Sequence, residues 1–90
     1  MFYFYTLKSL KDRKNYYGVT DNIERRLKEH NDGKNKSTRY RMPFVLIYTK
    51  EFIDKSAAYK YEWQVKHDGD TNKRLKKVLA EMAEVVKAHV

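Results

Sequence analysis

Aromatic and β-favouring residues form two short runs near the start of the chain. Phe2 to Leu7 is the first run and Tyr16 to Val19 the second, and the polar stretch Lys8 to Asn15 separates them. Residues of these types favour strands, and a short polar segment between two strands favours a hairpin. The pattern therefore predicts a β-hairpin with a basic loop.

A helix is predicted directly after the hairpin. Asp21 can cap its first turn, and Glu24 stands three residues later, which is the capping-box spacing. The turn residues Asn31-Asp32-Gly33 supply a stop signal. We expect this helix to run from about Asn22 to Asn31.

The middle of the chain changes from a polar segment to an apolar one. Lys34 to Pro43 contains four basic residues, no acidic residue and no apolar periodicity, which predicts a loop. Phe44 to Tyr48 is a continuous apolar run, typical of a strand that is buried on both faces.

Two more helices are predicted in the second half. Asp54 or Ser56 can cap the first, which extends to about His67, and the second begins near Asn72 after the turn residues Asp68-Gly69-Asp70. Its apolar residues recur at helical spacing and form one core-facing stripe: Leu75, Val78, Leu79, Met82 and Val86. The order is therefore ββαβαα, an α+β fold, and we expect one domain over residues 1–90.

The charge of the chain narrows the class of partner. Twenty Lys and Arg against twelve Asp and Glu give a net charge of +8, which attracts nucleic acids or anionic membranes. The cations spread over loops and two helix faces, whereas a membrane-surface helix concentrates them on one side of an amphipathic segment. Nucleic acid is therefore the expected partner.

Several functional classes lack the residues they need. The chain has no Cys, so a disulfide framework, a thiol nucleophile and a thiolate zinc site are excluded. It has no apolar run of about 20 residues and no signal peptide at its start, and we expect a cytoplasmic protein. A Gly-rich phosphate loop, a zinc-type His pair and a G-x-S-x-G motif are also missing.

Three charged or titratable residues are candidates for chemistry. Arg26 and His30 lie one turn apart on the same side of the first helix, although taken alone they are more simply explained as a surface cation and a helix-end histidine. Glu62 aligns with small and apolar positions of the next helix, where a carboxylate needs a partner. That partner is either a structural cation or a metal ion.

Basic residues in the loop and on the last helix are candidates for phosphate contacts. Lys34, Lys36, Arg39 and Arg41 are interleaved with Ser37, Thr38 and Tyr40, a mixture of charges, hydroxyl donors and one stackable ring. A merely solvated loop is an alternative on composition. The last helix turns Lys73 and Arg74 outward beside Lys76 and Lys77, and we expect the first two to contact nucleic acid as well.

Taken together, these residues resemble the GIY-YIG nuclease domain. Tyr3-Phe4-Tyr5 and Tyr16-Tyr17-Gly18 stand on the two strands, Arg26 follows eight residues after Gly18, and His30 and Glu62 come later. The resemblance covers nearly the whole chain and is closest to small stand-alone members, similar to the nuclease half of UvrC-type repair enzymes and to structure-specific junction nucleases. Two positions depart from the family pattern: Tyr3 stands where the family name has Gly, and Asn72 is a poorly placed counterpart of an asparagine that many members carry.

The resemblance implies a small three-stranded antiparallel sheet flanked by helices, one divalent cation, Mg²⁺ or Mn²⁺, and cleavage of DNA that leaves a 5′-phosphate. It implies that Tyr5 and Tyr16 activate or orient the attacking water or the phosphate, and that Arg26 stabilises charge on the phosphoryl oxygens. It further implies that Glu62 holds the metal, while His30 supports Arg26 or a proton transfer.

Physical reasoning adds that Gly18 allows the strand backbone to approach the site closely. Branched or damaged duplex DNA in repair or recombination would be the substrate, with a homodimer or a partner protein enlarging a small footprint. A non-catalytic nucleic-acid-binding module and a protein-interaction domain are the alternatives.

Overall fold

The computed structural model describes residues 1–88, and within the last helix the side chains up to Met82. The elements follow the predicted order ββαβαα, with one short 3-10 turn added. They are β1 (Phe2–Ser9), β2 (Asn15–Thr20), α1 (Ile23–Asn31), η1 (Arg39–Arg41), β3 (Phe44–Phe52), α2 (Lys55–His67) and α3 (Gly69–Ala88). The predicted fold class is confirmed.

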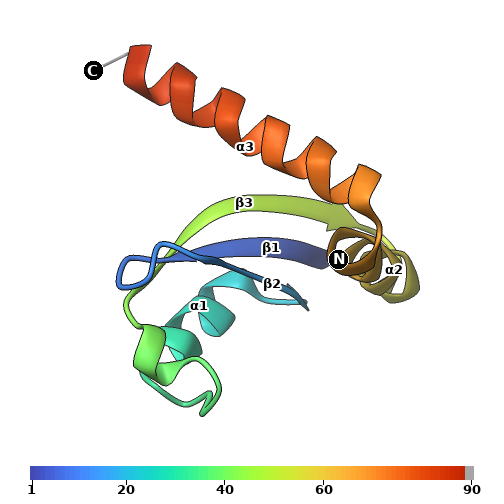
Figure 1. Cartoon of the computed structure of the whole chain (residues 1–90). Helices are drawn as coiled ribbons and strands as arrows, with labels where there is room; N and C mark the ends of the chain where they lie inside the picture. The colour runs from blue at the N-terminus through green and yellow to red at the C-terminus, as the bar shows by residue number, and fades with distance from the viewer. Residues whose placement is uncertain (89–90) are drawn as a thin grey trace.

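The three strands form an antiparallel sheet in the order β2-β1-β3, so the N-terminal strand is central. α1 lies on one side of the sheet and α3 on the other, while α2 lies at the end of the sheet near the N-terminus (Figure 1). In the β1–β2 register, Tyr5 is paired with Gly18, and Leu7 with Tyr16. This register places the segments Tyr3 to Tyr5 and Tyr16 to Gly18 side by side, with Tyr5 and Tyr16 on the α1 face.

Alternation along β1 separates the core into two clusters. Phe4 faces α2 and α3 and packs with Val65 and Leu75. Tyr5 and Leu7 belong to the other cluster, on the α1 face of the sheet. That cluster also contains Phe44, Tyr16, Ile23, Leu27 and Met42. A period of two in a strand therefore puts aromatic residues on both faces of the sheet.

The bounds of α1 match the prediction within one residue, but the predicted cap is wrong. Asn22, and not Asp21, caps the helix, because the Asn22 side chain accepts a hydrogen bond from the Arg25 amide at 3.0 Å. Asp21 instead forms an exposed ion pair with the Arg25 side chain at 2.8 Å. At the other end, Gly33 has φ +75°, a left-handed conformation that favours glycine.

β3 differs from the prediction in both length and burial. It runs four residues further than expected, to Phe52, and it is an edge strand rather than a strand buried on both faces. Val45 is 39% exposed and Leu46 is 38% exposed. The apolar run gave no sign of this exposure, because a strand's place in the sheet depends on its neighbours and not on its own sequence.

The junction between α2 and α3 is shorter than predicted. Asp54 caps α2 by accepting from the Ser56 amide at 3.0 Å. α3 begins at Gly69 and not near Asn72, because the Asp68 carboxylate accepts from the Asp70 amide and the Thr71 hydroxyl. Two consecutive helices therefore meet with a single residue between them.

The predicted apolar stripe of α3 is only partly buried. Leu75 is buried, whereas Val78 is 39% exposed and Met82 is 45% exposed, and Val86 lies outside the described side chains. Asn72 donates from Nδ2 to the Val65 carbonyl at 3.0 Å, so its amide holds the end of α2. None of the helices within residues 1–88 combines the length and the apolar character that crossing a membrane requires.

Candidate functional site

A close approach between two strands positions the first candidate tyrosine. Tyr5 lies over the α-carbon of its register partner Gly18, and a Cβ at position 18 would lie 2.8 Å from the Tyr5 Cε1 atom and closer still to its Cζ and hydroxyl. Any side chain there would displace the ring. The glycine is therefore required by space, which agrees with the reason the sequence suggested.

A chain of hydrogen bonds runs from the surface of α1 into the core. The Arg26 Nε atom donates to the Tyr5 hydroxyl at 3.3 Å, and this hydroxyl lies 3.4 Å from His30 Nε2. His30 Nδ1 in turn lies 2.9 Å from the Thr38 hydroxyl. Tyr5, His30 and Thr38 are each at most 2% exposed, so Arg26 connects a buried network to solvent.

The partners of this network fix the direction of its protons. The Thr38 hydroxyl donates to the Asn35 carbonyl at 3.5 Å, which leaves its oxygen to accept from His30 Nδ1–H. A neutral imidazole has one donor and one acceptor nitrogen, so Nε2 is the acceptor. Because Arg26 already donates to the Tyr5 oxygen, the Tyr5 hydroxyl directs its own proton to His30 Nε2.

The charge states agree with this arrangement. Burial, followed by the positive charge of Arg26, lowers the pKa of His30 below its ordinary value, which keeps the imidazole neutral. Burial raises the pKa of Tyr5, although Arg26 opposes that rise through its hydrogen bond and its charge. The same hydrogen bond raises the pKa of Arg26, which stays protonated. The resting site therefore holds a neutral phenol, a neutral imidazole and a cation.

The second candidate tyrosine packs against the same histidine. The Tyr16 ring lies 4.9 Å from the His30 ring in an edge-to-face arrangement and 6.5 Å from the Tyr5 ring. The Phe44 ring also lies near His30, at 5.5 Å between ring centroids. Rings on several sides restrict the imidazole to one orientation.

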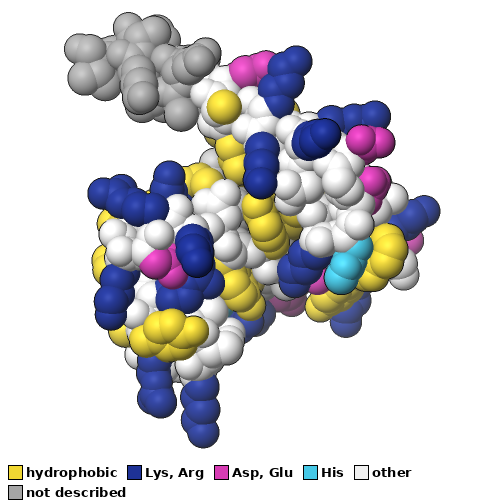
Figure 2. Space-filling model, viewed as in Figure 1, with side chains coloured by type: hydrophobic (Ala, Val, Ile, Leu, Met, Phe, Trp, Pro, Cys, Tyr) yellow, Lys and Arg dark blue, Asp and Glu magenta, His cyan; other side chains and the backbone are white. Residues whose placement is uncertain are grey.

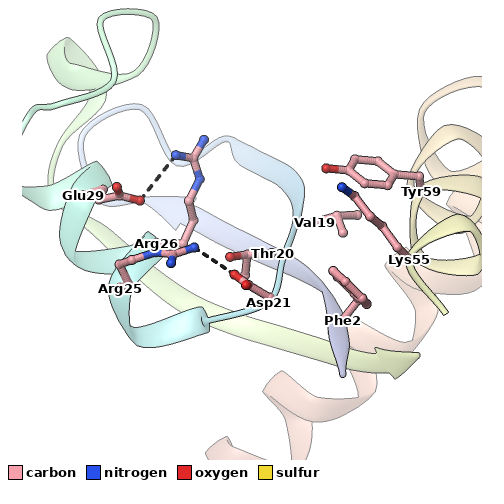
Figure 3. Close-up of a pocket in the computed structure, with 9 residues that line it drawn as sticks. All are labelled: Phe2, Val19, Thr20, Asp21, Arg25, Arg26, Glu29, Lys55 and Tyr59. Carbon is pink, nitrogen blue, oxygen red and sulfur yellow. Dashed lines mark hydrogen bonds and ion pairs between the residues drawn. The ribbon is translucent and has the colours of Figure 1, made fainter. Parts of the chain in front are cut away.

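A cleft of about 490 Å³ lies between α1 and α2, over the ends of β1 and β2. Arg26 lines it from α1, together with Arg25 and Glu29, while Lys55 and Tyr59 face them from α2 (Figure 3). Phe2, Val19, Thr20 and Asp21 complete the lining. Tyr5, Tyr16, His30 and Glu62 are not part of this lining, so Arg26 is the member of the predicted set that faces the cleft.

Glu62 lies on α2 at the border between its buried and exposed sides. Its side chain is 19% exposed and forms a long ion pair with Lys66 at 3.7 Å. It follows Tyr59 by three residues, which places both on one side of the helix. Burial is the largest cause that raises the pKa of Tyr5, and the charge of Glu62 adds a smaller contribution, so the carboxylate lies within electrostatic reach of that hydroxyl.

The donor set is compatible with one weakly held divalent cation. Among the described residues, no group of three or more His, Asp or Glu side chains could surround a metal ion. Mg²⁺ keeps several of its waters and is often held by one or two carboxylates together with substrate phosphates. Glu62 fits such a site as the protein ligand, because its ion pair with Lys66 is long and partly exposed.

The predicted phosphate-binding cations differ in how free they are. Lys34, Lys36 and Arg39 are exposed, as are Lys73 and Arg74 on α3. Arg41 is 17% exposed in its side chain, pairs with Asp12 at 2.8 Å and lies over the Phe44 ring. Lys and Arg side chains spread over the face in Figure 2 rather than forming one block.

Some residues of the site were not predicted in their observed roles. Thr38 was expected to offer a hydroxyl to phosphate, but it is buried and bonded to His30. Lys55, Tyr59 and Glu29 line the cleft without having been singled out. The spacing of Lys55, Tyr59 and Glu62, four and then three residues, was the available signal, since it places all three on one side of a helix.

Comparison with known proteins gives a family and several relatives. A family model described as the GIY-YIG catalytic domain matches residues 1–76. A UPF0213 protein of Lactiplantibacillus plantarum is 46% identical over 69 residues, which are 73% of this chain and 67% of that protein. One of Bacillus licheniformis is 47% identical over 72 residues, 79% of this chain and 73% of that protein.

A solved structure agrees with the observed architecture. The solution NMR structure of the UPF0213 protein BH0048 from Bacillus halodurans is 38% identical in sequence, with a TM-score of 0.52. The similarity covers 87% of this chain and 85% of that one. The arrangement of strands and helices is therefore shared with a relative whose structure was determined experimentally.

Proposed function

The chain belongs to the GIY-YIG family of nuclease domains, and on that premise we propose that it is a divalent-metal-dependent endonuclease that hydrolyses phosphodiester bonds in DNA. The observation that best supports this proposal is the position of Arg26, which lines the cleft and also donates to the buried Tyr5 hydroxyl. A nucleic-acid-binding module needs exposed cations, but it does not need a cation joined to a buried phenol and imidazole.

Arg26 stabilises the charge of the phosphoryl oxygens. Its Nε atom is engaged by Tyr5, and Nη1 contacts Glu29 only at 3.6 Å, so the outer edge of the guanidinium can turn to a phosphate in the cleft. A guanidinium that is already held in place requires little reorganisation when charge develops on the phosphate. Such a contact contributes roughly 3 to 4 kcal/mol to the stabilisation of a transition state.

Tyr5 and His30 manage the proton of the attacking water. The Tyr5 hydroxyl passes its proton to His30 Nε2 while its oxygen takes a proton from water, so that one proton ends on the imidazole and hydroxide attacks phosphorus. The P–O bond to the 3′ oxygen then breaks, and this oxygen takes a proton from solvent to become a 3′-hydroxyl. His30 does not reach the substrate and acts as a positioning residue that stores this proton. Thr38 and the ring of Tyr16 hold the imidazole in the orientation that the transfer requires.

Glu62 is the residue that would hold the cation, Mg²⁺ or Mn²⁺. When bound, the cation would polarise the phosphate and help to neutralise the leaving oxygen. Tyr16 orients the water or the phosphate from the β2 side. Lys34, Lys36, Arg39, Arg41, Lys73 and Arg74 are proposed to contact the DNA backbone, which gives affinity without sequence specificity.

The proposed setting is the cytoplasm, with branched or damaged duplex DNA as substrate in repair or recombination. A footprint this small favours a homodimer or a partner protein, because specific interfaces with DNA need more surface. Cleavage of DNAs that differ in structure selects among these substrates.

The test is cleavage of a labelled panel of branched, nicked, single-stranded and duplex DNAs with Mg²⁺ or Mn²⁺. We expect Arg26→Ala and Glu62→Ala to lower the rate at least about 100-fold while affinity for DNA changes only a few-fold. Arg25→Ala is the matched control, because Arg25 lines the same cleft but pairs with Asp21 and has no bond to Tyr5. It should retain cleavage within a few-fold of the wild type.

Each result has a defined meaning. Cleavage that is lost in both variants and kept in Arg25→Ala supports the nuclease and the assigned roles. A Glu62→Ala variant that cuts at the wild-type rate would overturn the metal-ligand role. DNA that is bound by the wild type but cut under none of these conditions would favour the non-catalytic binding module.

A further inference from the structure

α2 presents a stripe of exposed aromatic side chains. Tyr59, Trp63 and His67 follow one another at intervals of four residues, which places them along one side of the helix. Tyr59 is 47% exposed and Trp63 is 61% exposed. The Trp63 and His67 rings lie 4.9 Å apart with an angle of 37° between their planes. We name these three residues the α2 aromatic stripe.

Folding does not explain why this stripe is aromatic. The opposite side of α2 supplies the packing, since Ala58 and Val65 are buried there and Tyr61 contacts Phe4. The contact between Trp63 and His67, four residues apart, helps to stabilise the helix. Many other pairs of side chains at this spacing would stabilise it equally without exposing an indole ring to solvent. At the edge of the molecule where α2 lies, Figure 2 shows an exposed histidine beside apolar side chains. Exposed rings that gather in this way are typical of a binding surface.

The stripe is continuous with the proposed active site. Tyr59 is itself part of the lining of the cleft, on the side opposite Arg26 (Figure 3). Glu62 lies between Tyr59 and Trp63 in the sequence, at the border of the stripe. A strand of nucleic acid whose phosphate occupies the cleft would therefore reach the aromatic rings with its neighbouring nucleotides.

The charges near the stripe suit a polyanion. Lys55 lies 5.9 Å above the Tyr59 ring, and Lys60 and Lys66 are exposed on the same helix. Asp54 and Asp68 stand at the two ends of the helix, where they cap backbone amides, and Glu62 at the border of the stripe pairs with Lys66 at 3.7 Å. Aromatic rings flanked by lysines form the combination that binds single-stranded nucleic acid, because every base has a face that stacks.

We propose that the α2 aromatic stripe is a stacking platform for unpaired nucleotides beside the scissile phosphate. Tyr59 to His67 spans about 12 Å along the helix axis, which is room for about three stacked nucleotides at about 3.4 Å each. Paired bases in a continuous duplex present no free faces to these rings. The inference rests on the proposed function and refines its substrate class to DNA with a single-stranded segment at the cleavage site.

Trp63 allows a direct test, because it is the only tryptophan in the chain. Its fluorescence is followed during titration with a 12-nucleotide single-stranded DNA and with a blunt hairpin duplex, both in EDTA so that no cleavage occurs. Stacking of a base on the indole quenches its emission. We expect strong quenching by the single strand and little by the duplex when the same fraction of the protein is bound. The bound fraction is measured independently by fluorescence anisotropy of labelled DNA.

Variants distinguish stacking from other contacts. We expect Trp63→Ala to weaken binding of the single strand about tenfold, the range typical of one stacked base, while Trp63→Phe retains most of the affinity. Ile53→Ala is the matched control, because Ile53 is 87% exposed beside the start of α2 but has no aromatic face. Trp63 is exposed and its contact with His67 contributes at most about 0.5 kcal/mol, so the melting temperatures of its variants should lie within a few degrees of the wild type.

The outcomes separate this inference from the proposed nuclease activity. Quenching together with the affinity loss supports the platform, even in a protein that cleaves nothing. Unquenched emission at saturation, or wild-type affinity in Trp63→Ala, would overturn the platform while leaving cleavage of the DNA panel unaffected. A third outcome is that the single strand and the duplex bind equally well and that every stripe variant keeps this binding. The stripe would then contact something else, such as a partner protein, and the platform would also be overturned.

Discussion

Replacing Gly18 by alanine tests how closely the fold and the site depend on each other. The added Cβ would lie 2.8 Å from the Tyr5 Cε1 atom and closer to the end of the ring, so the ring must move. Tyr5 is 2% exposed and bonded to Arg26 and His30, so it has no free space to enter. We expect the substitution to break both hydrogen bonds.

The magnitude follows from the terms involved. Overpacking of a buried position costs about 1 to 3 kcal/mol, and each lost hydrogen bond costs about 1 kcal/mol. The reduced freedom of the unfolded chain returns about 0.4 to 1 kcal/mol. The net loss of unfolding free energy is therefore about 3 kcal/mol, which lowers the melting temperature by about 12 to 24 °C for a chain of this length.

Denaturant unfolding and DNA cleavage are the assays, and a double-mutant cycle gives the cause. In a Tyr5→Leu background, which removes the colliding atoms, Gly18→Ala should be close to neutral, so the two substitutions should be coupled by about 3 kcal/mol. Gly69→Ala is the matched control, because no atom lies within 4 Å of a Cβ at that position. It should be neutral or slightly stabilising.

The reasoning would be refuted by a Gly18→Ala protein that is as stable as the wild type and cleaves at the wild-type rate. It would also be refuted by a destabilisation of equal size in the Tyr5→Leu background, because the collision with the ring could then not be its cause.

Three further predictions concern the same network and the charged surface. Burial lowers the pKa of His30 in the folded protein below its ordinary value of 6.5, so the stability that the neutral imidazole contributes should be fully present above pH 6.5 and should be lost as the pH falls through the folded-state pKa. Denaturant unfolding at several pH values should show this dependence, and His30→Gln should remove most of it. Tyr5→Phe should keep the fold but lower cleavage about 100-fold or more, since the ring remains and the hydroxyl does not; wild-type cleavage in this variant would exclude Tyr5 from proton transfer. Affinity for duplex DNA should fall steeply with salt, and Lys34→Ala with Lys36→Ala should reduce the slope of log K against log salt by about 1.8, so an unchanged slope would remove these lysines from the interface.

The predicted elements that succeeded rest on local signals. The hairpin and α1 were predicted nearly to the residue, because strand-forming runs, the stop at Gly33 and helix periodicity all act over a few residues. The cap was misplaced by one position, since Asp21 and Asn22 are both good caps and the choice depends on which side chain reaches the Arg25 amide.

The burial of β3 could not be predicted in the same way. An apolar strand in a central position and one at a sheet edge have similar sequences, and the order β2-β1-β3 is set by pairing between segments about forty residues apart. The exposure of Leu46 at the edge therefore follows from topology. The start of α3 was predicted too late because Asp68 caps it directly after α2.

Within the candidate site, the sequence predicted pairs on one element better than contacts between elements. Helical spacing correctly placed Arg26 and His30 on one side of α1, and both contact the Tyr5 hydroxyl. The contact of His30 with Thr38 depends on the path of the loop after Gly33, which no periodicity describes. Likewise, Lys55 and Tyr59 reach the cleft only because α2 lies opposite α1.

The two sides of Arg26 explain how a small domain can hold a cation ready for a substrate. On the inner side, the Nε atom donates a hydrogen bond to the hydroxyl of Tyr5, which is buried, packed against Gly18 and close to His30. This bond restricts the position of the guanidinium. On the outer side, its ion pair with Glu29 is 3.6 Å long and both side chains are 33% exposed, and such pairs contribute at most about 1 kcal/mol. Under the proposed function, a phosphate would replace the Glu29 carboxylate at little cost while the inner bond keeps the arginine in place. The buried bonds to Tyr5 and His30 thus hold Arg26 in position before the substrate binds, which lowers the cost of ordering the guanidinium around a phosphate. A small core can supply a preorganised cation in this way.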